Sequence, residues 1–81
     1  MISKDDFNKL SLDDKGNIVF FEGKYIASRE YYNQLLMLYD LGSYFVEVFY
    51  NSHINLIANI QIMKDIKTLD IYIDSEIKQK S

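Results

Sequence analysis

The sequence predicts an α+β fold in which N-terminal helical segments pack on a four- to five-stranded, mostly antiparallel β-meander. Two serine-led, acid-rich segments open the chain, as helices commonly begin. The middle of the chain is rich in aromatic and β-branched residues. The length of 81 residues suits a single domain over 1–81. We expect helical cover over 1–23, the meander over 24–63, and a strand or short helix over 64–81.

The opening segment carries two signals for the start of a helix. Ser3 and Ser11 can each act as an N-cap, and each is followed within three residues by a pair of aspartates. The acidic pairs are better explained by helix N-terminal electrostatics than by metal binding. We expect helix through about Glu22, with Gly23 as a left-handed C-terminal cap. Gly16 is a poor residue for the middle of this helix.

Four segments after the helical opening have the composition of strands, namely Lys24–Tyr32, Gln34–Asp40, Tyr44–Tyr50 and Leu56–Met63. The last of these alternates apolar and polar residues, which indicates a strand with one wetter face, antiparallel to the strand before it. Together the four segments predict a meander.

The register of the central hairpin has two alternatives. A two-residue loop at Leu41-Gly42 sets Tyr39 opposite Tyr44 and Met37 opposite Val46. A three-residue loop with a bulge at Gly42 or Ser43 sets Leu38 against Val46 instead. In the two-residue version, the reverse face carries Leu36, Leu38, Phe45, Glu47 and Phe49. Either register makes both faces apolar, so helices must cover one face and something must contact the other.

The C-terminal segment is compatible with two structures. Leu69, Ile71 and Ile73 alternate with polar residues, which indicates a strand. Leu69, Ile73 and Ile77 are spaced four apart behind a possible cap at Thr68, which indicates a helix. The β-branched content favours an edge strand followed by a frayed helical turn.

Composition narrows the classes of function. Zero cysteine excludes thiolate metal sites and thiol nucleophiles, and the single histidine, His53, lies in a predicted turn with no partners for a metal site. The net charge of −3 makes nucleic-acid binding unlikely as a function. The acidic opening residues and the short uncharged stretch Tyr31–Tyr39 predict neither a secretory signal nor a membrane span, hence a cytoplasmic location. We expect no cofactor, no metal and no catalytic residues.

Arg29 is the only arginine and lies between Tyr25 and Tyr31 on one alternating strand face. It can clamp a carboxylate or phosphate, or stack between rings. The simpler interpretation is a salt bridge to Glu47 or another strand carboxylate, with cation–π packing. A desolvated Glu47 could act as an acid or base, but no second catalytic group accompanies it.

The seven tyrosines are more than so small a core accommodates. About four suit the core or cross-strand pairs, which leaves two or three for a surface patch. The candidate ligand- or partner-binding residues are Arg29, Tyr25, Tyr31, Tyr32, Glu47 and Tyr50.

The segments Lys24–Asn33 and Tyr44–Tyr50, with Leu38-Tyr39 between them, carry a resemblance to known sequences. They resemble a loose set of short uncharacterised bacterial proteins with a helical opening, an aromatic Arg-x-Tyr-Tyr-Asn strand and a Val-Glu-Val-aromatic-Tyr strand. The resemblance spans roughly residues 5–63 and implies a helix followed by a meander. It implies no function, cofactor or catalytic residue, and Gly16 departs from the opening helix of that set.

These observations lead to two hypotheses of function. The first is a non-enzymatic protein-interaction module that uses an aromatic-rich sheet surface and can form a homodimer. The alternative is a binder of a small anionic ligand, centred on Arg29 and the strand tyrosines.

Overall fold

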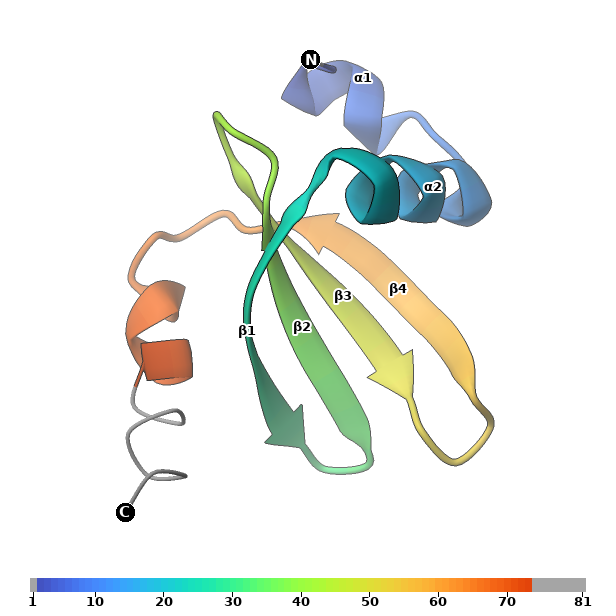
Figure 1. The fold of residues 1–81 in the computed structure, drawn as a ribbon, viewed down its shortest axis with the longest axis vertical. Coiled ribbons are helices and arrows are strands. Elements are labelled where there is room, and N and C mark those ends of the chain that lie inside the picture. Colours follow the sequence, from blue (N-terminus) through green and yellow to red (C-terminus); the bar gives the residue numbers. More distant parts are fainter. Residues whose placement is uncertain (1, 74–81) are drawn as a thin grey trace.

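The computed structural model describes residues 2–73 and confirms the predicted α+β class (Figure 1). The helices α1 and α2 come first, and a four-stranded antiparallel sheet with the order β1-β2-β3-β4 follows. Residues 68–73 form a further helical segment. The bounds are α1 Lys4–Asn8, α2 Leu12–Glu22, β1 Lys24–Tyr31, β2 Gln34–Asp40, β3 Phe45–Asn51 and β4 Leu56–Ile62.

Both predicted N-caps are present. The Ser3 hydroxyl accepts a hydrogen bond from the Asp6 N–H at 3.2 Å, and the Ser11 hydroxyl accepts one from the Asp14 N–H at 3.2 Å. Aspartates occupy the first turn of each helix, where the helix dipole favours negative charge. The chain therefore starts both helices at the positions that the serines predict.

Gly23 ends α2, but the predicted left-handed cap is wrong. Its backbone is extended, with φ −77° and ψ 152°. A Cβ atom at this position would lie 2.4 Å from the Val19 carbonyl oxygen, which also accepts the Gly23 N–H at 2.8 Å. Glycine is needed here because the chain turns tightly against the end of its own helix.

The central hairpin has neither of the two predicted registers. Asp40 pairs with Phe45 and Met37 pairs with Val48, so the loop has four residues, Leu41–Tyr44. The Leu41 N–H donates to the Tyr44 carbonyl at 3.0 Å and closes it. The register differs from that of the two-residue loop by two residues. Each side chain therefore keeps the face that the two-residue loop predicts.

Two bulges interrupt the alternation of side chains between the faces. Pairing between β1 and β2 shifts between Tyr25 and Ala27, and pairing between β3 and β4 shifts between Phe49 and Tyr50. As a result, Ile57 faces the same side of the sheet as Tyr50.

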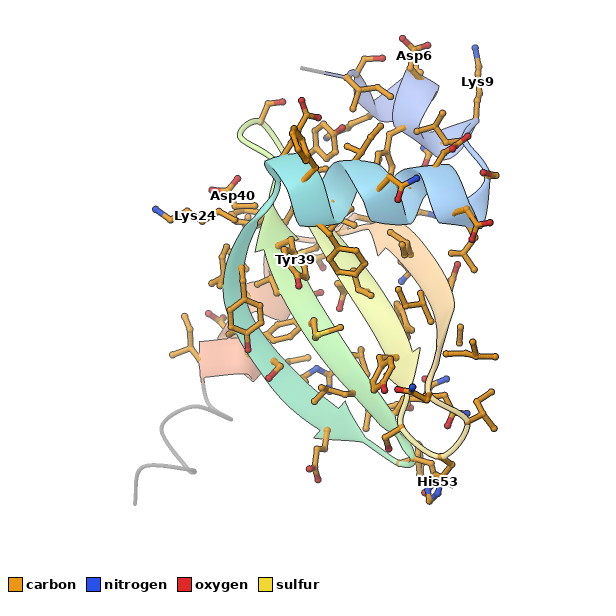
Figure 2. The ribbon with its side chains drawn as sticks, turned by 45° about the vertical axis from the view of Figure 1, so that its right-hand side comes forward. Asp6, Lys9, Lys24, Tyr39, Asp40 and His53 are labelled. Atoms are coloured by element: carbon orange, nitrogen blue, oxygen red, sulfur yellow. The ribbon has the colours of Figure 1, made fainter. Side chains whose placement is uncertain are left out.

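Helices lie on both faces of the sheet (Figures 1 and 2). On the α2-side face, the helices and strands bury Phe7, Val19, Leu41, Tyr44, Val46, Val48 and Ile60. On the reverse face, residues 68–73 cover a second cluster of Ala27, Leu36, Leu38, Met63 and Tyr72, with Leu69 at its margin. The two apolar faces thus have separate covers.

The predicted C-terminal edge strand is therefore wrong where the structure describes this segment. Leu69 and Tyr72, three residues apart, both pack on the reverse face, whereas Ile71 and Ile73 are exposed. Residues three apart in a helix lie on the same side of it, so the helical segment brings the side chains of Leu69 and Tyr72 to the sheet together. Residue 77, which the helical alternative used, lies outside the described residues.

Candidate functional site

Among the described residues, α2 covers the α2-side face at one end of the sheet, where it crosses the strands (Figure 2). Beside the helix, Tyr39 makes two edge-to-face ring contacts. Its centroid lies 5.6 Å from that of Phe20 on α2 and 5.6 Å from that of Tyr25 on β1. Phe20 and Tyr25 are about half exposed, at 49% and 52%. The three rings thus form a cluster that is open to solvent.

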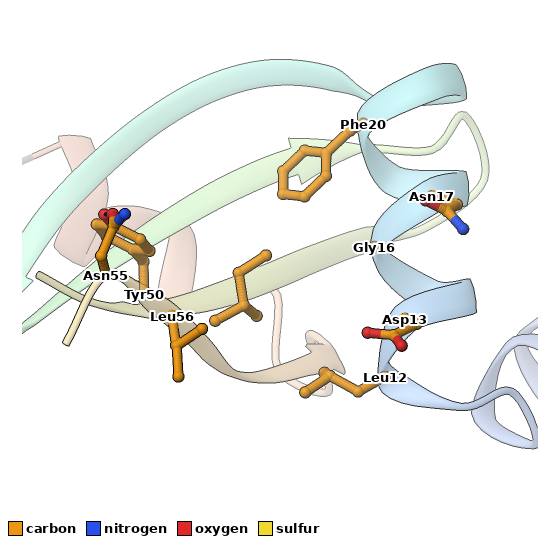
Figure 3. Close-up of a pocket in the computed structure, with 9 residues that line it drawn as sticks. Leu12, Asp13, Gly16, Asn17, Phe20, Tyr50, Asn55 and Leu56 are labelled. Atoms are coloured by element: carbon orange, nitrogen blue, oxygen red, sulfur yellow. Dashed lines mark hydrogen bonds between the residues drawn. The ribbon is translucent and has the colours of Figure 1, made fainter.

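A groove continues from this cluster between α2 and the β3–β4 hairpin (Figure 3). Its volume is about 640 Å³. Leu12, Gly16 and Phe20 line it from successive turns of α2. Tyr50 and Ile57 line it from the sheet, where they pair with each other across β3 and β4. The absence of a side chain at Gly16 leaves the groove open in the middle of the helix.

The cluster and the groove form one surface, which we call the aromatic face. It consists of Phe20, Tyr25, Met37, Tyr39, Tyr50 and Ile57. Among the strand residues on this side of the described sheet, Glu30 is the only one with a charged side chain, and it lies at the far end of β1. Burial raises the pKa of Tyr39, and the neighbouring Tyr25 raises it further. The hydroxyl of Tyr39 is therefore uncharged at neutral pH. The strand residues of the aromatic face are therefore largely apolar, and Asp13 of α2 adds one carboxylate to the lining of the groove.

The structure divides the predicted binding residues between the two faces. Tyr25 and Tyr50 belong to the aromatic face, whereas Arg29, Tyr31 and Glu47 lie on the reverse face. The expectation that Tyr25 shares a face with Arg29 is wrong, because the bulge after Tyr25 reverses the alternation.

Tyr32 belongs to neither face. It occupies the tip of the β1–β2 hairpin with φ 55° and is 88% exposed, its ring 4.6 Å from that of Tyr31. Tyr25 and Tyr31 are also exposed, which agrees with the expectation of two or three surface tyrosines.

Arg29 makes ring contacts and no ion pair among residues 2–73. Its guanidinium carbon lies 5.4 Å from the centroid of Tyr31 and 5.5 Å from that of Tyr72. The expected cation–π packing is confirmed, and the expected salt bridge to Glu47 is wrong. None of the four described cavities is lined by Arg29, so the structure adds no support for an anion site there.

Tyr72 connects the reverse face to Glu47. Its hydroxyl donates to Glu47 Oε2 at 2.8 Å, and both side chains are buried. Burial, the hydrogen bond and the negative charge of Glu47 raise the pKa of Tyr72, and the nearby Arg29 lowers it by less. The hydroxyl is thus held as a donor to Glu47.

Sequence reasoning missed Phe20, Tyr39 and Tyr72 as site residues. The four-residue spacing of Leu12, Gly16 and Phe20 is the signal that could have indicated the groove, because such residues share one helix face. Nothing in the local sequence indicates that Tyr72 contacts Glu47, 25 residues earlier.

His53 is exposed in the turn between β3 and β4, as predicted (Figure 2). Its backbone N–H donates to Asn51 Oδ1 at 3.0 Å. Within residues 2–73, no three His, Asp or Glu side chains come together as a candidate metal site. No helix in this range is long and apolar enough to span a membrane.

Comparisons with protein-family models, curated proteins and solved structures give no match to this chain. The resemblance to short bacterial proteins stays a prediction, and the case for function rests on the geometry of the two faces.

Proposed function

We propose that this chain is a non-enzymatic protein-interaction module that pairs with a second copy of itself through the aromatic face. The observation that carries the proposal is the exposed ring cluster of Phe20, Tyr25 and Tyr39 beside the groove under α2. Exposed aromatic surface next to a concavity is typical of protein contacts. The proposal places this pairing in the cytoplasm, and the cysteine-free composition is compatible with that location.

The distribution of charge favours a second copy as the partner. The chain carries a net charge of −3, so two copies repel each other unless the contacting surfaces lack charge. The ring cluster meets this condition, since Glu30 at the far end of β1 is the only charged strand residue on that side of the described sheet. Asp13 of α2 lines the groove and is not part of the cluster. In a symmetric dimer each patch faces its own copy, and an apolar patch is complementary to itself.

The mass in solution tests this pairing. We expect the mass measured by light scattering after size exclusion to rise from the monomer value of 9.6 kDa towards twice that value as the protein concentration increases from about 10 µM to about 1 mM. Tyr25→Glu introduces a charge into the aromatic face and should weaken association at least about ten-fold.

Tyr32→Glu is the matched control, because it makes the same change at an exposed tyrosine outside the aromatic face. It should change association by less than about two-fold. A chain that stays monomeric at the highest concentration contradicts the proposal, and so does an equal effect of the two substitutions.

A further inference from the structure

Glu47 is the one buried charged residue among residues 2–73, at 6% exposed. It lies on the reverse face of β3, where it pairs with Leu38 of β2 and Gln61 of β4. A buried carboxylate is costly unless a cation or several donors compensate it. Glu47 therefore requires a partner that accounts for its position.

The described partners account for only one of its two carboxylate oxygens. Oε2 accepts the hydrogen bond from Tyr72, and no residue in 2–73 makes a hydrogen bond to Oε1 or an ion pair with the carboxylate. Arg29 on the same face contacts the rings of Tyr31 and Tyr72 and makes no ion pair with Glu47. Oε1 is thus left without a described partner, and it is not sealed from solvent, because Arg29 Nε is the only side-chain nitrogen or oxygen among residues 2–73 that is both buried and unpartnered.

Glu47 also lines a cavity of about 740 Å³ between α1, the end of β4 and the segment that follows it. Four exposed charged residues line the same cavity, namely Lys4, Asp5, Lys64 and Asp65. With Glu47 they make three carboxylates and two ammonium groups. The cavity is therefore net negative, and its one buried charge is negative.

The remaining lining suits an organic cation. Gln61 and Thr68 supply a carbonyl and a hydroxyl oxygen, and Ile62 and Met63 supply apolar surface. A primary ammonium group has three N–H donors and no acceptor. Carboxylate, amide and hydroxyl oxygens can each accept one of these donors, while an alkyl chain lies against the two apolar side chains.

We propose that this cavity binds a small primary alkylamine in its protonated form, with the Glu47 carboxylate as its counter-ion. Tyr72 is a positioning residue, because its hydrogen bond to Oε2 holds the carboxylate while Oε1 is left for the ligand. The cavity shares no residue with the aromatic face, so the site is independent of dimer formation.

Titration of the ¹⁵N-labelled chain with n-butylamine at neutral pH, followed by amide NMR, tests this site. We expect saturable shifts at Glu47, Gln61 and Thr68. The neutral isostere n-butanol should bind at least about ten-fold more weakly, because it lacks the charge that Glu47 attracts. This comparison uses the unaltered chain, so it does not depend on the folding of a variant.

Glu47→Gln should weaken butylamine binding at least about ten-fold and keep an acceptor for Tyr72. Glu30→Gln is the matched control, since it removes the same charge from the opposite face of the sheet, and it should change binding by less than about two-fold. The proposal is overturned if butylamine gives no saturable shifts, if butanol binds equally well, or if the two variants weaken binding equally.

Discussion

Gly16 and Gly23 lie seven residues apart at α2, and a methyl group has opposite consequences at the two positions. At Gly16 a Cβ would lie 3.7 Å from Ile60 Cδ1 and 3.7 Å from Phe20 Cε2, both ordinary contact distances. At Gly23 it would lie 2.4 Å from the Val19 carbonyl oxygen, which is backbone and cannot move aside.

We expect Gly16→Ala to raise the free energy of unfolding by about 0.5–1 kcal/mol, because alanine is the better residue in a helix interior. Gly23→Ala should lower it by about 1–3 kcal/mol through the clash. Urea denaturation measures both changes as shifts of the midpoint at constant slope. Urea midpoints that shift in the same direction for both variants would contradict this expectation. They would show that helix propensity alone determines how alanine changes the stability at both positions.

At the scale of the elements, burial of the reverse face depends on the packing of residues 68–73, which contact the sheet through Tyr72. Tyr72→Phe removes the donor to Glu47 and should cost about 1–3 kcal/mol at neutral pH, because it leaves a buried carboxylate without its described partner.

The same contact predicts a dependence on pH. Burial and the contact with Glu47 raise the pKa of Tyr72 in the folded chain above the usual tyrosine value of 10.0, so its contribution to stability is complete below pH 10 and is lost as the pH rises further. We expect the free energy of unfolding to fall above pH 10, with up to about 1.4 kcal/mol per pH unit from this residue.

Urea denaturation between about pH 8 and pH 11.5 measures this slope. Tyr72→Phe should reduce the slope without abolishing it, because the pKa values of Tyr39 and Tyr44 are also raised by burial. Tyr32→Phe is the control at an exposed tyrosine. A slope as steep in Tyr72→Phe as in the unaltered chain would contradict this role of Tyr72.

The elements also show which features of the fold can be predicted from the local sequence. Ser3 and Ser11 predict the helix starts, because capping involves only neighbouring residues. The register of the central hairpin cannot be predicted in this way, since both loop alternatives bring apolar residues face to face. The C-terminal helix forms because Leu69 and Tyr72 reach the reverse face together, which is a long-range contact.

The candidate site was predicted only in part for the same reason. Exposure of Tyr25 and Tyr31 follows from the surplus of tyrosine over core volume. The bulge after Tyr25 has no mark in the sequence, yet it separates Tyr25 from Arg29. The salt bridge expected between Arg29 and Glu47 is replaced by contacts to Tyr72, a residue of a segment whose position the local pattern does not reveal.

At the scale of the whole molecule, the charge of the chain predicts how the proposed dimer responds to salt. Salt screens repulsion between two copies of net charge −3, while the aromatic face offers few charge pairs that salt could weaken. We expect association to stay constant or to strengthen by up to about three-fold between about 50 and 500 mM NaCl. Sedimentation equilibrium over this range measures it, and a ten-fold weakening would show that charged pairs make the contact.

The four-residue loop Leu41–Tyr44 has a consequence for the variants that this fold can accept. A slip of the β2–β3 pairing by two residues leaves every side chain of β3 on its own face, whereas a slip of one residue exchanges the faces. A one-residue slip would turn Glu47 towards α2 and Val46 and Val48 towards residues 68–73. A single inserted residue should therefore be tolerated only where the loop takes it up and the pairing of Asp40 with Phe45 is kept.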